Sequence, residues 1–164
     1  MSTILVRQAT SKDLTTVCDI LQEAALWLEK RNMALWGEKE ISTEVIRSDI
    51  QSNSFHIAFC ENDAAGVVKF QTEDLVFWSD IPHQDSAFIH RLAVRRRFAG
   101  GAVSTALIKW AVDRSRQLGK RYLRLDCDAA RHSLRCLWVS FAPSNCFRFL
   151  FCFTCHSLRS SVRR

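Results

Sequence analysis

The sequence predicts an α+β fold in which helices flank a β-sheet. Short apolar segments with strand composition alternate with segments whose apolar residues recur at helical spacing. Two strand-like segments are separated by a short polar turn, which indicates a hairpin, and a later one runs through a small-residue turn into a helix. With 164 residues and 48% apolar content, the chain fits a single domain with a packed core.

The first part of the chain predicts a strand, two helices and the hairpin. Thr10-x-x-Asp13 resembles a capping box with Asp in place of Glu, so the first helix should begin at Thr10 or Ser11. The polar residues Glu61-Asn62-Asp63 form the hairpin turn. The predicted elements are a strand over Ile4–Arg7, a helix ending near Arg31, a helix over Ser42–Ser52, and hairpin strands over Phe55–Cys60 and Ala65–Gln71.

The functional prediction depends on a strand–turn–helix segment from Ser86 to Gly119. An apolar strand, Ala87–Val94, is followed by Arg95, Arg96 and Arg97, by the small-residue run FAGGA, and by a helical pattern that starts at Val103. A helix N-terminus offers unpaired N–H groups and the positive end of a dipole, and small residues let a ligand reach them. With three arginines adding positive charge, the segment predicts a phosphate or pyrophosphate site. An ordinary glycine-rich connection is the alternative.

Two common phosphate-binding motifs do not fit this turn. A Walker loop needs Gly-Lys-Ser/Thr at the helix start, and a dinucleotide fingerprint needs G-x-G-x-x-G after an early strand. The segment instead resembles the GNAT superfamily of N-acetyltransferases, whose signature Gln/Arg-x-x-Gly-x-Gly/Ala follows a strand ending in Leu-x-Val. Leu92-Ala93-Val94 supplies that strand end. Two registers of the signature remain open, one on Arg97, Gly100 and Ala102, the other on Ala99, Ala102 and Ser104.

The resemblance covers roughly residues 3 to 141 and implies the fold and the donor. The fold would be a mixed, mostly antiparallel central sheet flanked by helices, with a further strand over Arg121–Cys127. Acetyl-CoA would be the co-substrate, with its pyrophosphate on backbone N–H groups and its pantetheine amides paired with the strand end. The residues implied in binding it are Leu92, Ala93, Val94, Arg97, Ala99, Gly100, Gly101, Ala102, Val103, Ser104 and Thr105.

The same resemblance implies that a primary amine attacks the thioester directly, so no cysteine nucleophile is needed. Cys18 and Cys60 are on apolar faces, which favours core packing. A base must take the ammonium proton, and the candidates are Asp85, Glu73, Asp126 and His90. The tyrosine that commonly protonates the leaving thiolate in this family is replaced by Trp138, which cannot act as an acid, so we expect slowed turnover.

Two regions line the acceptor side in the resembled family. The first is the end of the first helix with Trp27 and Trp36, and the second is the stretch Glu73–Asp85, which is rich in aromatic and acidic residues. The functional interpretation is a binding-site entrance lined by aromatic and acidic side chains, which would suit an amine. The alternative for both tryptophans is packing in the core or at a hinge.

The tail from Arg131 to Arg164 differs from the rest of the chain. It holds six arginines and no acidic residue, whereas the other 130 residues carry 17 basic and 17 acidic side chains. The net charge of +6 therefore lies in the tail, and a nucleic-acid-binding face across the fold is not indicated. We accordingly divide the chain into an acetyltransferase domain over residues 1–131 and an atypical tail over 132–164.

The tail departs from the family pattern, which has Gly-Phe where Ala142-Pro143 stands here. Its composition resembles translation out of frame, so we consider a frameshift near residues 131–142. Alternating phenylalanines from Phe147 to Phe153 predict one more strand. Cys152-x-x-Cys155-His156 matches a haem-attachment pattern, and with Cys146 the same residues could hold zinc, but a cysteine-rich tail produces such spacings by chance. No metal site is assigned.

Three functions remain open from the sequence. They are an N-acetyltransferase acting on a small-molecule or peptide amine, a catalytically impaired acyl-CoA-binding module, and a metal or interaction protein that works through its tail. The N-terminus lacks the apolar run of a secretory signal, and no stretch is long enough to span a membrane. We therefore expect a cytoplasmic protein with reduced cysteines and no membrane or nucleic-acid partner. A homodimer is one candidate assembly.

Overall fold

The computed structural model describes residues 3–128 and 148–154, with side chains up to residue 125. The helices are α1 (Leu14–Glu29), α2 (Thr43–Gln51) and α3 (Val103–Gln117), and the short 3-10 turns are η1 (Ser11–Asp13), η2 (Glu38–Ile41) and η3 (Arg96–Phe98). The strands are β1 (Ile4–Gln8), β2 (Phe55–Cys60), β3 (Asp63–Gln71), β4 (Ser86–Val94), β5 (Tyr122–Asp128) and β6 (Arg148–Thr154). Every predicted element is confirmed, with boundaries that differ by about two residues, as expected where helix and strand ends fray.

Contacts divide the chain into two compact units whose segments are interleaved. The first unit contains residues 1–70 and 91–111, and the second contains residues 71–90 and 112–164. Strand β4 begins in the second unit and ends in the first, and helix α3 begins in the first and ends in the second.

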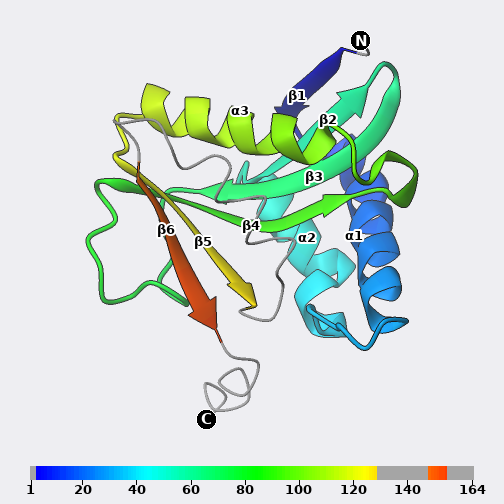
Figure 1. The fold of residues 1–164 in the computed structure, drawn as a ribbon, viewed down its shortest axis with the longest axis horizontal. Coiled ribbons are helices and arrows are strands. Elements are labelled where there is room, and N and C mark those ends of the chain that lie inside the picture. The colour runs from blue at the N-terminus through cyan, green and yellow to red at the C-terminus, as the bar shows by residue number, and fades with distance from the viewer. Residues whose placement is uncertain (1–2, 129–147, 155–164) are drawn as a thin grey trace. The chain divides into compact units, whose positions relative to one another are not determined.

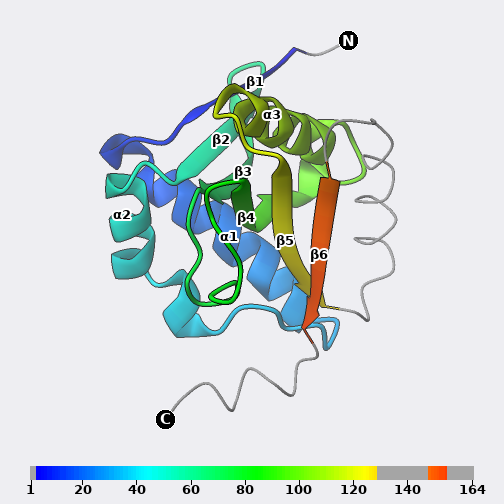
Figure 2. The same ribbon diagram turned by 90° about the vertical axis from the view of Figure 1, so that its left-hand side faces the viewer.

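The first unit is built on three antiparallel strands. β1 pairs with β2 from Ile4↔Cys60 to Gln8↔His56, and β2 pairs with β3 around the predicted turn, with an irregularity in register between Ala58 and Phe59. Helices α1 and α2 cover one face of these strands, and the start of α3 covers the other (Figures 1 and 2).

Because helices cover both faces, both sets of side chains on β2 and β3 are buried. Phe55, Ile57 and Val67 belong to the core formed with α1 and α2. On the other face, His56 lies against Trp110 of α3, with ring centroids 4.0 Å apart. The near-continuous apolar runs of these strands follow from this arrangement, since neither face is left to water.

The entry to α1 is fixed by one carboxylate. Asp13 accepts hydrogen bonds from the N–H and the hydroxyl of Thr10, both at 2.8 Å, which gives the predicted contact across the helix start. Arg7 of β1 donates two more, at 2.8 and 2.9 Å. The Arg7 guanidinium is the main reason that the pKa of Asp13 lies well below its usual range, although burial opposes the shift.

The second unit contains a parallel arrangement. The first half of β4 pairs with β5 from Ser86↔Tyr122 to Ile89↔Leu125, and β5 pairs with β6 from Tyr122↔Arg148 to Asp128↔Thr154. Figure 1 shows β5 and β6 side by side. The strand predicted from the alternating phenylalanines is therefore confirmed as β6, while the rest of the tail, including the proposed frameshift region and Trp138, lies outside the described residues.

The predicted fold class is confirmed as a mixed sheet with helices. Of the strand pairings given above, two are antiparallel and two are parallel. Over residues 3–128 and 148–154, no helix is both long and apolar enough to cross a membrane.

Candidate functional site

The predicted anion site lies where β4 passes into α3. The turn between them contains η3, the exposed residues 99–102, and Gly100 with a φ of +78°. The first helical hydrogen bond runs from the N–H of Ala106 to the carbonyl of Ala102, at 2.9 Å. The N–H groups of Val103, Ser104 and Thr105 precede this bond, so the helix supplies them with no carbonyl partner. They form the positive end of α3, where an anion is stabilised.

The glycines of the turn keep the approach to these N–H groups clear. Around the position that a Cβ would take at Gly100, no described heavy atom lies within 4 Å, so this position faces open space. Its left-handed backbone is one that side-chain-bearing residues rarely adopt. At Gly101 a Cβ would lie 3.3 Å from the Phe98 carbonyl oxygen.

A third glycine, Gly66 of β3, sets the distance between the strands and α3. A Cβ at Gly66 would lie 2.8 Å from the carbonyl oxygen of Ala93, 3.0 Å from Val103 and 3.2 Å from Leu107. The absent side chain therefore lets the end of β4 and the first turns of α3 pack closely on β3. The sequence analysis missed Gly66, although a glycine inside a strand pattern is a signal of close backbone approach.

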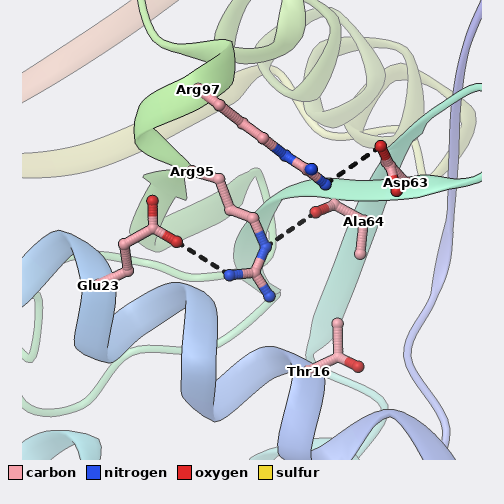
Figure 3. A pocket seen from close by; sticks show the side chains of 6 residues that line it. All are labelled: Thr16, Glu23, Asp63, Ala64, Arg95 and Arg97. Carbon is pink, nitrogen blue, oxygen red and sulfur yellow. Dashed lines mark hydrogen bonds and ion pairs between the residues drawn. The ribbon is translucent and has the colours of Figure 1, made fainter.

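The three arginines of the turn make contacts within the protein that the sequence analysis did not predict. Arg95 donates to the Glu23 carboxylate at 2.9 Å and to the Ala64 carbonyl at 3.1 Å. Arg97 is 3.1 Å from the Asp63 carboxylate. Figure 3 shows these contacts around a cavity of about 500 Å³ that Thr16 also lines. The cavity presents two cations and two anions, so its charges largely cancel.

Arg96 is held by helix α1 in a different way. Its guanidinium lies over the ring of Trp27, 3.8 Å from the centroid, and Arg31 lies 4.1 Å from the same centroid. Its backbone N–H donates to Glu23 at 2.6 Å. Burial by itself would raise the pKa of Glu23, but this N–H and the Arg95 guanidinium lower it below its usual value. Trp27 thus stacks with two arginines, a contact that favours the packing interpretation.

Strand β4 is distorted just before the predicted pantetheine-binding residues. Arg91 has a φ of +49° in the middle of the strand. The left-handed conformation costs roughly 1–2 kcal/mol for a residue other than glycine. Such strain persists only where surrounding contacts impose it, and it is common near functional sites. Leu92, Ala93 and Val94 follow directly, of which Ala93 is buried and the other two are partly buried.

A second cavity, of about 910 Å³, lies between α1 and α2 in the region predicted to receive the acceptor. Trp36 lines it and also packs against the core, which supports the packing interpretation, while its role toward an acceptor stays a prediction. Glu29, Glu38 and Lys39 contribute charged side chains to its wall, and Trp27 does not line it. The remaining lining residues are Gln22, Ala25, Leu26, Ala34, Gly37, Ile41, Ser42 and Thr43.

The second unit contains a carboxylate–imidazole pair formed by Asp74 and His90, of which the sequence analysis named only His90. The Asp74 carboxylate is 3.0 Å from Nε2 of His90 on β4, and both side chains are largely buried. The other oxygen of Asp74 accepts the N–H groups of Val76 and Phe77, both at 3.1 Å. Burial would raise the pKa of Asp74, but His90 and these N–H groups lower it. Glu73, which the sequence analysis gave as a candidate base, is exposed.

Asp85, the other predicted catalytic carboxylate, has contacts typical of a structural residue. Its carbonyl oxygen accepts the N–H groups of Arg121 and Tyr122, at 2.8 and 3.0 Å, and its carboxylate lies 3.8 Å from the Arg121 guanidinium. The carboxylate is 53% exposed. Asp85 precedes the first residue of β4, whereas the turn follows the last. The side chains of Asp126 and Trp138 lie outside the described part of the chain.

Of the two described cysteines of the first unit, Cys18 lacks the setting of a nucleophile. Cys18 is buried, and burial raises the pKa of its thiol, which disfavours the reactive thiolate. Cys60 is partly buried on β2 rather than fully enclosed.

Comparison with known proteins identifies the family. Residues 17–138 match the family model described as the acetyltransferase (GNAT) family, which spans well over half of the chain. The chain belongs to the GNAT acetyltransferase family. It is 28% identical over 132 residues to YesJ, an uncharacterised N-acetyltransferase of Bacillus subtilis strain 168, covering 77% of this chain and 73% of YesJ. The family resemblance stated from the sequence is therefore confirmed.

Solved GNAT structures have the same fold. A GNAT-family acetyltransferase of Listeria monocytogenes 4b F2365 superposes with a TM-score of 0.71 at 22% identity, covering 87% of this chain and 90% of that one. The PaiA N-acetyltransferase of Thermoplasma acidophilum, solved in complex with coenzyme A, gives 0.69 at 16% identity, covering 85% and 89%. At these identities the likeness shows the fold.

Proposed function

We propose that this GNAT protein transfers an acetyl group from acetyl-CoA to a primary amine of a small molecule or peptide. The observation that carries the proposal is the start of α3, where three N–H groups precede the first helical bond behind an open glycine turn. This is the chemistry that a pyrophosphate requires. Coenzyme A in the solved PaiA complex supports the choice of donor.

The donor would be bound mainly through backbone groups. Its pyrophosphate would take the N–H groups of residues 103–105 at the start of α3, because those of Phe98, Ala99 and Gly101 already donate to carbonyls within the turn. Its pantetheine amides would pair with Leu92–Val94 at the end of β4. The side chains of Arg95 and Arg97 favour this assignment, because each already contacts a carboxylate that would compete with a phosphate. Either register of the family signature is compatible with such binding.

The reaction would proceed by direct attack. The amine lone pair adds to the thioester carbonyl, a C–N bond forms, and the C–S bond breaks. Coenzyme A leaves as a thiolate that takes a proton from water, and the nitrogen gives up a proton as the amide forms. The acceptor would occupy the cavity between α1 and α2, where Glu29 and Glu38 can attract a cationic amine and Trp36 offers an apolar wall.

The ammonium must lose a proton before the free amine can attack, and we propose His90 as the base that takes it. The Asp74 carboxylate contacts one imidazole nitrogen and is itself fixed by two loop N–H groups, which is the arrangement that orients a general base. Glu73 and Asp85 are exposed and lack such a partner arrangement among their described contacts. His90 therefore replaces them as the first residue to test.

Thermal denaturation with acetyl-CoA tests the donor, and thiol release with a panel of amines tests turnover. At about 100 times its dissociation constant, a ligand adds roughly 2.7 kcal/mol of stability, which for a domain of this size raises Tm by about 5–10 °C. A shift with thiol release supports the enzyme. A shift without thiol release supports the impaired acyl-CoA-binding module, for which Trp138 is the argument. No shift with millimolar acetyl-CoA would remove both.

A further inference from the structure

Asp49 of α2 makes a pair of contacts that the catalytic proposal does not use. Its Oδ1 accepts a hydrogen bond from Lys69 of β3 at 2.7 Å, and its Oδ2 accepts one from Nη1 of Arg91 on β4. All three side chains are only 16% exposed. One carboxylate of a helix thus binds two cations that stand on different strands of the first unit.

The position of Asp49 is itself well determined. Ser42 caps α2, its hydroxyl accepting the N–H of Val45, and Ile46 and Ile50 anchor the helix in the core. The carbonyl of Asp49 also accepts the N–H of Ser54, at 3.0 Å. The carboxylate is therefore presented from a fixed backbone, and the groups that it binds must adapt to it.

Arg91 is the residue with the left-handed backbone, and it directly precedes Leu92–Val94. A charge-assisted hydrogen bond with little access to water is strong enough to impose an unfavourable backbone conformation. A left-handed residue in a strand also changes the direction in which the following peptide groups point. Asp49 can therefore affect the donor site without touching the donor.

We infer that Asp49 is a positioning residue of the acetyl-CoA site. Its ion pair with Arg91 holds the distortion in β4 and so orients the peptide groups of Leu92–Val94 toward the donor. This inference rests on the proposed function. The simpler alternative is that Asp49 only fastens α2 to the sheet, a role in which Lys69 would matter as much as Arg91.

Substitutions at Arg91 separate the two roles. Arg91→Gly and Arg91→Ala both remove the ion pair, but glycine accepts the left-handed conformation and alanine does not. We expect Arg91→Ala to weaken acetyl-CoA binding about tenfold relative to Arg91→Gly. Because both variants lose the same side chain, this difference reports the backbone and not the attachment of α2.

Asp49→Asn completes the test, with binding of acetyl-CoA measured by calorimetry. Asp49→Asn should weaken binding about tenfold in the wild-type background and less than about twofold in the Arg91→Gly background, where no ion pair remains to break. Lys69→Met is the matched control, since it leaves the Asp49–Arg91 pair in place, and should change binding by less than about threefold.

Equal binding by Arg91→Gly and Arg91→Ala would overturn the inference, as would an effect of Asp49→Asn that persists in the Arg91→Gly background. The comparison at Arg91 decides the matter even if Asp49→Asn fails to fold. Failure of the wild-type protein to bind acetyl-CoA would remove the proposed function, and this inference with it. If instead the wild-type protein binds acetyl-CoA and the two Arg91 variants bind it equally, only the role of Asp49 is overturned and the proposed function stands.

Discussion

Gly66→Ala adds one methyl group at the place where β3, β4 and α3 meet. The new Cβ would lie 2.8 Å from the backbone oxygen of Ala93, a distance that real Cβ contacts essentially never show. The new Cβ would also lie 3.0 Å from Val103 and 3.2 Å from Leu107, so it could not move away from Ala93 without pressing on these side chains. Because the nearest atom belongs to the backbone of a strand, a rotamer change cannot relieve the contact, and β4 must move.

Two opposing effects determine the size of the change in stability. Replacing glycine by alanine restricts the unfolded chain, which stabilises by about 0.4–1 kcal/mol at a compatible site. Overpacking a closely packed site costs about 1–3 kcal/mol, and a clash with backbone belongs at the upper end. We expect a net loss of about 2 kcal/mol. At roughly 2–4 °C per kcal/mol, Tm should fall by about 4–8 °C.

Urea and thermal denaturation monitored by circular dichroism measure this change, and Gly37→Ala is the matched control. Gly37 has an ordinary φ of −73°, and a Cβ there would meet only the flexible Glu40 carboxylate, at 3.4 Å. The control should therefore be neutral or slightly stabilising. If Gly66→Ala is as stable as the control, β3 and β4 are less closely packed than the structure indicates, and our account of the turn's support is wrong.

Three further predictions concern the turn, the entry to α1 and the base. Gly100→Val should weaken acetyl-CoA binding by tenfold or more, roughly the cost of a β-branched residue at positive φ, whereas Arg96→Ala should change it by less than about threefold. Calorimetry measures both affinities. If Arg96→Ala weakened binding more than Gly100→Val, side-chain charge and not the backbone would bind the phosphate. Because the pKa of Asp13 is depressed in the folded protein, its carboxylate stabilises the fold above about pH 4, and this stabilisation is lost as the pH falls through the folded-state pKa. In Asp13→Asn, the free energy of unfolding should therefore depend less on pH in the acid range. The same acid dependence in the variant and the wild type would contradict this prediction. His90→Gln should lower kcat/KM by about 10²–10⁴, while Glu73→Gln should leave it unchanged. An unchanged kcat/KM in His90→Gln would assign the proton to another group.

The elements were predictable because their signals are local. Apolar spacing in the stretch from Thr10 to Arg31, and polar residues at 61–63 between two apolar runs, depend only on neighbours in the chain. The same holds for the run of small residues between β4 and α3. These short-range patterns were enough to name the fold, the family and the segment of the candidate donor site.

The contacts around that segment were not predictable because they join distant parts of the chain. Arg95 and Glu23 are 72 positions apart, and Arg91 and Asp49 are 42 positions apart. Nothing in the sequence distinguishes the exposed Glu73 from its buried neighbour Asp74, since only packing decides which of two adjacent acids turns inward. The contacts of the three arginines were missed for the same reason, because Glu23 and Trp27 of α1 and Asp63 of β3, which supply them, are distant in the sequence.

An anion site made of peptide N–H groups, as we propose for the first turn of α3, has a consequence for mutational scanning. An alanine scan removes side chains and leaves every N–H in place, so Val103, Ser104 and Thr105 could each be replaced with little loss of donor affinity. Only proline deletes the donor group itself, and it is tolerated at the first position of a helix. A scan of this region would therefore not detect the contribution of the peptide N–H groups. Relatives could change the side chains of Ser104 and Thr105 while keeping the same ligand, whereas Val103 is buried beside Gly66 and is constrained by packing.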